Sequence, residues 1–433
     1  MNSFDRYIKR RNIFYTFSLW FVCTILFVFA SCTKKGAVDV APMSHPTADT
    51  SGDIRTVFAK SNSFVLFKQA YNKAGVDSLL VPGSYFTIFA PVDSAMQAAG
   101  LDAAHISSLS KDSIKQFVLY HIVYGAYNSG SLTSALCSVE ANTLRQDVTY
   151  DTTSANAFVY QQNLYIKKSG IVYVNGEPVT NPQDTAYSAS NGYIWPVKSA
   201  LKAPCQTLWQ IIKSRSELSM YLMALHINDS LYLNTYGFQI DGKSFNSVAG
   251  DSFSFSRMVY ENQPQSYFYG RVKPTVFAPT NKAFNDAGFF TYNDLLNFAL
   301  ISPPSVSYDD NWNMIRNFAN LDSLLKLHLI INKDNKYTNM SLYNDFMFNP
   351  DINNGAFNNT IFWQGQDKAL GSSYVALSPQ PAFPLNFTNA NGAAKIQWNP
   401  AIGGVILPVD KSRHLMGMNG VLYEIDQLFY PHN

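Results

Sequence analysis

The sequence predicts a mixed α+β protein in which one folding unit occurs twice. Three short segments from the first half of the chain return, in the same order, in the second half. Each half combines short apolar strands with amphipathic helices, which is the pattern of an α+β unit. Repetition at this scale in a chain of 433 residues predicts two tandem domains.

An export signal is expected at the start of the chain. Four basic residues precede an apolar run from Ile13 to Ala30, which is the layout of a secretory signal. The run is 18 residues long, so a membrane helix that stays in place is the alternative. The segment Phe29 to Cys32 resembles the lipobox of bacterial lipoproteins, although Phe29 stands where Leu is usual. That resemblance implies a signal peptide over residues 1–31 and lipid attachment at Cys32, which would anchor the protein in an outer membrane.

Residues 32–52 are predicted to form a flexible tether, because they contain two lysines, two prolines and little apolar content. Removal of residues 1–31 takes away four basic residues and Asp5, which leaves 28 basic residues against 29 acidic ones. This balance argues against a nucleic-acid partner, because the phosphate backbone requires a clustered positive face. The expected partners are the membrane, through the lipid, and a protein or a glycan. Whether the anchor faces the cell surface or the periplasm is left open.

The first repeated segment is Phe86 to Ala95, which corresponds to Pro274 to Ala283. Each is expected to form a short apolar strand that ends at a proline, since proline donates no hydrogen bond to a neighbouring strand. The polar residue that follows, Asp93 in one segment and Asn281 in the other, is expected to cap a helix.

The second repeated segment carries a histidine, His121 in the first half and His328 in the second. Each histidine follows a predicted amphipathic helix, over residues 113–119 and 321–327. The third segment begins with an Asn-Gly pair, Asn191-Gly192 or Asn419-Gly420. Asn-Gly is expected to form a turn with positive φ before a closing strand.

These landmarks, in this order, resemble the fasciclin family: a strand that leads into Phe-Ala-Pro and a helix, a histidine motif after a later helix, and a terminal Asn-Gly strand. Residues 174–179 resemble the penultimate hairpin of the family, and helical openings are expected over residues 56–74 and 207–225. The resemblance covers about residues 53–203, called the first copy below, and residues 204–433, called the second copy. It implies that each copy is a bent β-sandwich that carries several helices on one side.

The resemblance implies a role in adhesion or protein–protein interaction. In some animal fasciclin domains a Tyr-His pair in the second motif is implicated in receptor binding, and Tyr120 and His121 stand at those positions. In the second copy Leu327 replaces the tyrosine. A histidine after an amphipathic helix is more often a packed, hydrogen-bonded core residue. Burial is therefore the favoured interpretation of this pair.

The second copy is longer than the first by 37, 19 and 21 residues between equivalent landmarks. Long connections are usually functional or unstructured, because ordering them costs entropy. The first insertion, about residues 234–269, contains an alternating Ser-Phe segment that suggests a hairpin. Aromatic rings near asparagines in the insertions suit a sugar-binding surface, although burial in a core is commoner for a single ring. The alternative function is therefore a glycan-binding accessory of an outer-membrane polysaccharide uptake system, with candidate residues Trp363, Phe362, Tyr267 and Tyr269.

Catalysis finds little support in the sequence. We find no glycine-rich phosphate loop, no Gly-x-Ser-x-Gly elbow and no histidine pair at metal-binding spacing. The protein is therefore expected to be no enzyme and to need no cofactor or metal. Beyond the predicted signal and lipidation site, only Cys137 and Cys205 remain. A disulfide between them and two separate buried thiols are both open.

Overall fold

The computed structural model describes the chain in segments. They are residues 52–81, 83–135, 137–146, 148–150, 158–160, 162–236, 275–308, 310, 314–317, 319–330, 348–353, 375–377, 385–390, 393–398, 406–408 and 414–430. Within these segments no helix combines the length and the apolar character that a membrane crossing requires. The predicted signal peptide, the lipidation site Cys32 and nearly all of the predicted tether lie outside them.

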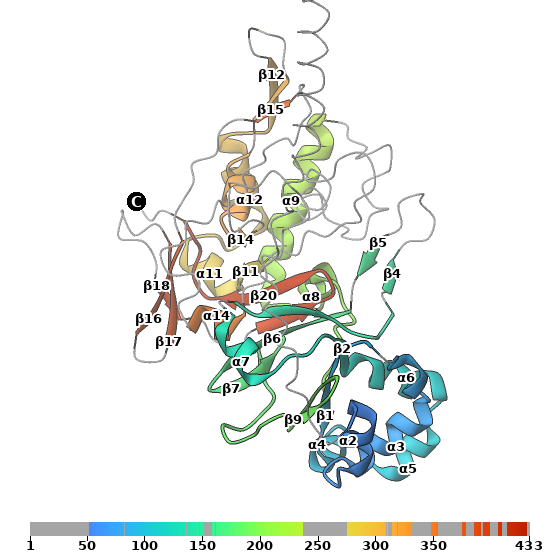
Figure 1. Cartoon of the computed structure of the whole chain (residues 1–433). Helices are drawn as coiled ribbons and strands as arrows, with labels where there is room; N and C mark the ends of the chain where they lie inside the picture. The colour runs from blue at the N-terminus through green and yellow to red at the C-terminus, as the bar shows by residue number, and fades with distance from the viewer. Residues whose placement is uncertain are drawn as a thin grey trace, which may run out of the picture. The chain divides into compact units, whose positions relative to one another are not determined.

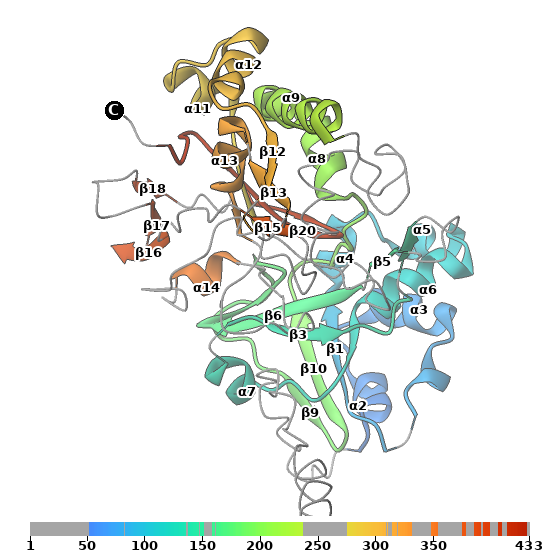
Figure 2. The ribbon, with the colours of Figure 1, turned by 90° about the horizontal axis from the view of Figure 1, so that it is seen from above.

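The first copy is organised around a four-stranded sheet in the order β2-β1-β10-β9 (Figure 1). Strand β1 (Phe86–Pro91) runs parallel to β10 (Gly192–Val197) at its centre. Strands β2 (Ile122–Tyr124) and β9 (Tyr187–Ala189) pair antiparallel at the two edges. The first and last strands of the copy therefore lie side by side, as Figure 2 shows for β1 and β10.

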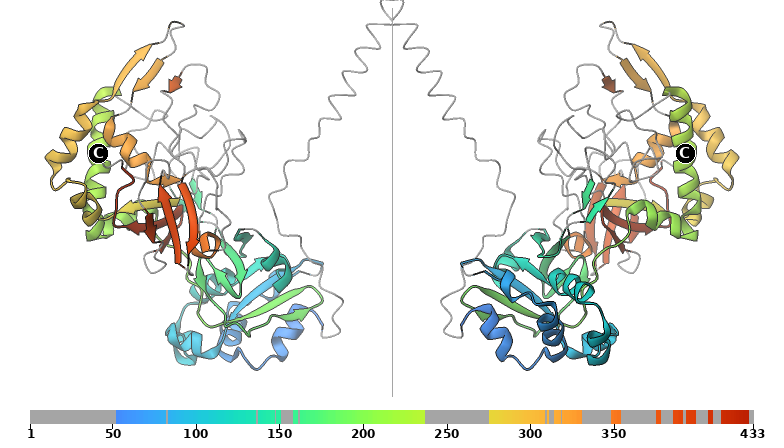
Figure 3. Two further views of the ribbon diagram at one scale, coloured as in Figure 1. Left: turned by 90° about the vertical axis from the view of Figure 1, so that its left-hand side faces the viewer. Right: turned by 90° about the vertical axis from the view of Figure 1, so that its right-hand side faces the viewer.

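Both faces of this sheet are buried, because successive side chains of a strand point to opposite sides. Ile88, Ala90 and Ile194 pack into a core with the helices. Those helices are α2 (Ile54–Lys60), α3 (Val65–Ala74), α4 (Asp93–Ala98), α5 (Ala103–Ser108) and α6 (Lys111–Tyr120), and Figure 3 shows them in blue and cyan. Phe89 and Trp195 point the other way, into a second core.

The second core lies between this sheet and another sheet of the first copy. Its strands, in the order β3-β6-β7-β8, are β3 (Val139–Asn142), β6 (Asn163–Ser169), β7 (Ile171–Val174) and β8 (Glu177–Pro178). Leu164, Ile166 and Val172 from this sheet meet Phe89 and Trp195. The first copy is therefore a β-sandwich with helices on one side, as expected. The short elements η1 (Asp77–Leu79), α7 (Ser129–Ser134), β4 (Val148–Tyr150) and β5 (Phe158–Tyr160) complete it.

The second copy repeats the first sheet with the same topology. Its order is β14-β11-β20-β19, with β11 (Thr275–Pro279) parallel to β20 (Gly420–Ile425) between β14 (Leu329–Ile330) and β19 (His414–Gly417). Phe277 lies beside Tyr423 on the paired strand β20, and Phe89 lies in the same way beside Trp195 on β10. Both phenylalanines are fully buried. The α+β class and the internal duplication predicted from the sequence are therefore confirmed.

The helical segments predicted at the start of each copy, residues 56–74 and 207–225, are each divided into two α-helices. Residues 56–74 form parts of α2 and α3, with a break at residues 61–64. The corresponding opening of the second copy forms α8 (Leu208–Ser214), the 3-10 turn η2 (Ser216–Leu218) and α9 (Ser219–Tyr236). The helices α11 (Asn281–Asp286), α12 (Tyr292–Ile301) and α13 (Asn320–Lys326) follow. Most of these helices contribute to one apolar core with β11 and β20.

The insertions of the second copy are structured in part. The 19-residue gain contains a hairpin of β12 (Ser305–Tyr308) and β13 (Met314–Asn317), and β13 also pairs with β15 (Val375–Leu377). Helix α14 (Asn349–Asn353) precedes a sheet of β16 (Leu385–Ala390), β17 (Ala393–Trp398) and β18 (Ile406–Pro408). The predicted Ser-Phe hairpin lies outside the described residues.

The positive-φ turn occurs in the penultimate hairpin. Asn175 and Gly176 have φ of 54° and 84° between β7 and β8. Asn191 and Asn419 also lie in turns before the closing strands β10 and β20, as predicted, but neither has positive φ, because Asn175 is the non-glycine residue with positive φ in the described part of the chain. Gly192 is instead the first residue of β10, where an added Cβ would lie 1.9 Å from the Phe86 carbonyl oxygen. This glycine is required because two backbones approach closely.

Candidate functional site

The histidine of the second motif lies inside the first copy, fully buried. The Nδ1 of His121 donates to the carbonyl oxygen of Phe117 at 2.8 Å, and its Nε2 accepts from the backbone N–H of Leu201 at 2.9 Å. The ring therefore ties the end of α6 to the segment that follows the last strand. Burial lowers the pKa of His121 to about 4, against the opposing effect of the Phe117 hydrogen bond. The ring is neutral at neutral pH.

His328 makes the same contacts in the second copy. Its Nδ1 donates to the carbonyl oxygen of Leu324 at 3.0 Å, and its Nε2 accepts from the N–H of Phe429 at 2.8 Å. It is also fully buried, and burial lowers its pKa to about 4. The backbone oxygens of the two histidines accept from Phe89 and Phe277, each at 2.8 Å. The motif thus performs the same internal role twice.

Asp93 and Asn281 cap helices, but not the helices that follow them. The Oδ1 of Asp93 accepts from the N–H of Leu66 at 2.8 Å, in the first turn of α3. The Oδ1 of Asn281 accepts from the N–H of Met220 at 2.8 Å, in the first turn of α9. The prediction that each residue caps a helix is therefore confirmed, and the structure shows that the helix is a neighbouring one. Each residue is the first of its own helix, so its side chain is free to reach the unpaired N–H of a neighbouring helix.

The asparagines of the third motif also accept hydrogen bonds from the first backbone N–H of a helix. The Oδ1 of Asn191 accepts from the N–H of Ile54 at 2.7 Å, and the Oδ1 of Asn419 accepts from the N–H of Leu208 at 2.8 Å. Ile54 opens α2 and Leu208 opens α8. Each bond therefore ties the start of a copy to its last hairpin. The hydrogen bond from the asparagine side chain, and not a positive φ, explains why both segments carry this residue.

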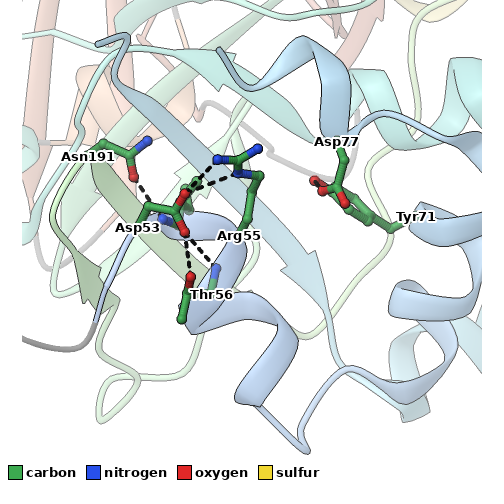
Figure 4. A network of polar contacts seen from close by, with 7 residues as sticks. Asp53, Arg55, Thr56, Tyr71, Asp77 and Asn191 are labelled. Carbon is green, nitrogen blue, oxygen red and sulfur yellow. Dashed lines mark hydrogen bonds and ion pairs between the residues drawn. The ribbon is translucent and has the colours of Figure 1, made fainter. Parts of the chain in front are cut away.

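Figure 4 shows these contacts at the start of α2. Asp53 is the N-cap, and its Oδ1 accepts from the N–H of Thr56 at 2.9 Å and from the Thr56 hydroxyl at 2.7 Å. Its Oδ2 pairs with the Arg55 guanidinium at 2.9 Å. The hydrogen bonds from Thr56 lower the pKa of Asp53. Tyr71 donates to Asp77 at 2.5 Å nearby. All of these polar groups have partners within the first copy, so this cluster fixes the helices.

Removal of a motif cap should destabilise the helix that it serves. We expect Asp93→Ala to cost about 1 kcal/mol, because the first turn of α3 loses its acceptor. Asp93→Asn should retain most of the stability, since Asn281 does the same work with an amide oxygen. Urea unfolding and hydrogen exchange at the start of α3 measure both effects. The exposed neighbour Ser94→Ala is the control, and unchanged exchange at Leu66 in Asp93→Ala would contradict the assignment.

Tyr120 is a core residue with a polar end. It is 1% exposed, and its hydroxyl accepts from the Asn175 amide at 3.0 Å. Burial raises the pKa of Tyr120 to about 12. The Arg145 guanidinium lies 5.8 Å from the centre of the ring. Neither Tyr120 nor His121 is at the surface, which agrees with the favoured interpretation from the sequence. Receptor binding through this pair stays a prediction.

The remaining sequence candidates have different outcomes. The lipidation residue and the glycan candidates Trp363, Phe362, Tyr267 and Tyr269 lie outside the described residues. Cys137 and Cys205 are not joined by a disulfide, and the alternative of two buried thiols is wrong for Cys205, which is exposed, while Cys137 is half-buried. Among the described residues no group of three or more His, Cys, Asp or Glu side chains is placed to hold a metal.

Large apolar side chains reach the surface at positions that the motifs did not indicate. In the second copy they gather at helix α12: Phe290 is 65% exposed, Tyr292 49%, Leu300 47% and Ile301 74%. In the first copy the exposed ones are Val65, Leu79, Val81, Tyr124 and Tyr187. The sequence signal for the first group is an apolar helix over residues 292–301, which periodicity alone did not single out.

The family comparison agrees with the fold of the first copy. The fasciclin domain family model matches residues 62–204. Residues 62–204 form a fasciclin domain. Among solved structures, a FAS1 domain pair from the insect cell adhesion molecule fasciclin I is similar, with 13% identity and a TM-score of 0.29 over 84% of this chain and 96% of that one. A search of curated proteins finds no match. The fasciclin match covers the first copy from just after α2 to the segment that follows its last strand, β10.

Proposed function

We propose that this protein is a lipid-anchored envelope protein that binds other proteins through the outer faces of tandem fasciclin domains. The observation that carries the proposal is the set of hydrogen bonds that the motif residues make. In both copies the histidine, the helix-capping residue and the asparagine bond to the protein's own backbone. The family landmarks thus build a scaffold, and the exposed apolar side chains supply the contact surface. We propose no catalytic role.

Attachment of intact cells tests the binding role. Cells that display the full chain should adhere to protein-coated surfaces or to neighbouring cells more than cells that lack it. A chain with His121→Ala and His328→Ala, which weakens both copies, should lose adhesion in proportion to the loss of folded protein. Equal attachment with and without the chain would reject the role. Protease treatment of intact cells determines whether the domains face outward.

Lipid anchoring depends on Cys32 in this proposal. We expect Cys32→Ser to move the protein from the membrane fraction to the soluble fraction and to abolish incorporation of a labelled fatty acid, because the thiol that would carry the lipid is lost. Cys137→Ser is the matched control and should change neither result. A Cys32→Ser protein that still carries the label would disprove the anchor site.

The alternative is glycan binding by the insertions of the second copy, favoured by the concentration of aromatic and asparagine residues there. A glycan array distinguishes it from protein binding. We expect signal that falls at least tenfold in Trp363→Ala and little in Phe357→Ala. An array with no signal for the unchanged protein would end this alternative.

A further inference from the structure

The outer face of the sheet β3-β6-β7-β8 is buried at one end of β6. Side chains alternate along this strand, so Leu164 and Ile166 point into the second core of the first copy. Asn163 and Tyr165 therefore point away from that core, to the side of an antiparallel sheet that commonly faces solvent. Asn163 is nevertheless only 6% exposed and Tyr165 only 4%. A part of the chain outside the two sheets of the sandwich must cover them.

The cover comes from the second copy. Helix α14 contacts β6, and the ring of Phe348, next to the start of α14, has its centre 5.2 Å from that of the Tyr165 ring. Phe348 is fully buried, and its carbonyl oxygen accepts from the Ile352 N–H at 3.1 Å, so this residue is fixed to the first turn of α14. At the other end of β6, Lys167 donates to the carbonyl oxygen of Ala135, so there the first copy covers its own strand.

The turn of the penultimate hairpin makes a further contact with the second copy. Gly176 has φ of 84°, and an added Cβ would lie 3.0 Å from Cε1 of His414 and 3.1 Å from Cδ1 of Phe348. The centre of the His414 ring lies 5.8 Å from that of Phe348 and 5.0 Å from that of Tyr423. Backbone without a side chain therefore lies directly against two rings of the second copy. Glycine is required here both for its conformation and for the close approach.

Asn175 joins the two contact points of the first copy. Its backbone N–H donates to the Tyr165 carbonyl oxygen at 2.8 Å, and its Oδ1 accepts from the Tyr165 N–H at 3.0 Å. Its side-chain amide donates to the hydroxyl of Tyr120, which belongs to the second core. Beside this turn, Oε1 of the exposed Glu177 lies 3.9 Å from Nδ1 of His414. The surface that receives the second copy is therefore held in place by hydrogen bonds of the first copy.

We propose that Phe348, α14 and His414 form a latch that docks on Tyr165 and Gly176 and holds the two copies as one rigid unit. Tandem domains of one chain move relative to each other unless an apolar interface joins them. Here packed rings supply that interface, in addition to the linker of residues 198–207 between β10 and α8. A fixed pair presents both copies to a partner without the cost of ordering them. The latch rests on contacts within the chain and not on the adhesion role.

Spin-label distance measurements on the full chain test the latch. Labels at Ala104→Cys in α5 and Asn297→Cys in α12, both exposed positions, report the distance between the copies once Cys137→Ser and Cys205→Ser remove the free thiols. We expect one narrow distribution of distances. Gly176→Leu should widen it about twofold or more, because its side chain collides with the latch and the copies then move about the linker. The same chain without the two new cysteines measures the background.

Gly170→Leu is the matched control for Gly176→Leu. Gly170 lies in the turn between β6 and β7 with φ of 73°, and an added Cβ would meet no atom within 4 Å. The two variants carry the same kind of backbone strain, but only Gly176→Leu meets the second copy. Equal widening in both variants, an unchanged width in Gly176→Leu or a wide distribution in the unchanged chain would each overturn the proposal.

Hydrogen exchange in the first copy provides a second measurement. Phe348→Ala should speed the exchange of the Tyr165 N–H about tenfold, because β6 loses its cover. Phe284→Ala removes an equally buried ring from α11, in the helical core of the second copy, and should leave exchange at Tyr165 unchanged. The latch would be contradicted by equal exchange at Tyr165 in Phe348→Ala and in the unchanged protein.

Discussion

Stability should fall by several kcal/mol as the pH drops from 6.5 to 4, because both core histidines must remain neutral. The pKa of His121 and that of His328 are about 4 in the folded protein, against an ordinary value near 6.5. As the pH falls through this window, the unfolded chain binds protons that the folded chain does not. The stabilisation is therefore complete above pH 6.5 and is lost by pH 4. A difference of about 2.5 units corresponds to roughly 3 kcal/mol for each histidine.

The physical cause is that a protonated ring has no acceptor nitrogen. The Nε2 of His121 would then face the N–H of Leu201 as a second donor, and a charge would lie in the core. His226 contributes in the same direction, since partial burial and then Lys213 lower its pKa. The carboxyl groups with lowered pKa, such as Asp53, lose their contribution at lower pH, so the window above 4.5 isolates the histidines.

Urea unfolding at intervals between pH 7.5 and 4.5, with hydrogen exchange to follow each copy, measures this loss. His121→Ala should weaken the first copy by about 3 kcal/mol at pH 7.5, because a buried side chain and two hydrogen bonds are removed. Its remaining stability should depend less on pH in this window. The exposed His105→Ala is the control and should match the unchanged protein. A constant unfolding midpoint down to pH 4.5 would contradict the assignment of neutral, buried rings.

Gly192→Ala should destabilise the first copy by about 3 kcal/mol or more, because its Cβ would collide with backbone and not with a movable side chain. The new methyl group would lie 1.9 Å from the Phe86 carbonyl oxygen, at the start of the parallel pair β1 and β10. Relief of the clash requires those two strands to separate. Hydrogen exchange of β1 and β10 should therefore rise more than that of the second copy, and the urea midpoint should fall.

Gly100→Ala separates this close approach from the general cost of glycine replacement. Gly100 has φ of 75°, and an added Cβ would meet no atom within 4 Å. It should cost only about 1 kcal/mol, the usual penalty for a side chain in the left-handed region. Equal losses in the two variants would show that backbone conformation, and not the approach of β1 to β10, explains the glycine.

The sequence by itself determined the duplication and the local structure of its landmarks. The apolar run that ends in each Phe-Ala-Pro forms a central strand, and Asn191 and Asn419 lie in the turns before the closing strands. The favoured burial of His121 also follows the pattern of an amphipathic helix with apolar neighbours. These features depend on residues a few positions apart, so periodicity and turn chemistry are enough to predict them.

Only the tertiary structure decided which backbone group each polar side chain hydrogen-bonds. Asn191 bonds to Ile54 across 137 positions, and Asn419 bonds to Leu208 across 211. Such pairs exist because the parallel pairing of the first and last strands brings the ends of each copy together. No local pattern encodes that approach. The exposure of Phe290 and Ile301 has the same origin, since an apolar side chain is buried or exposed according to what the folded chain packs against it.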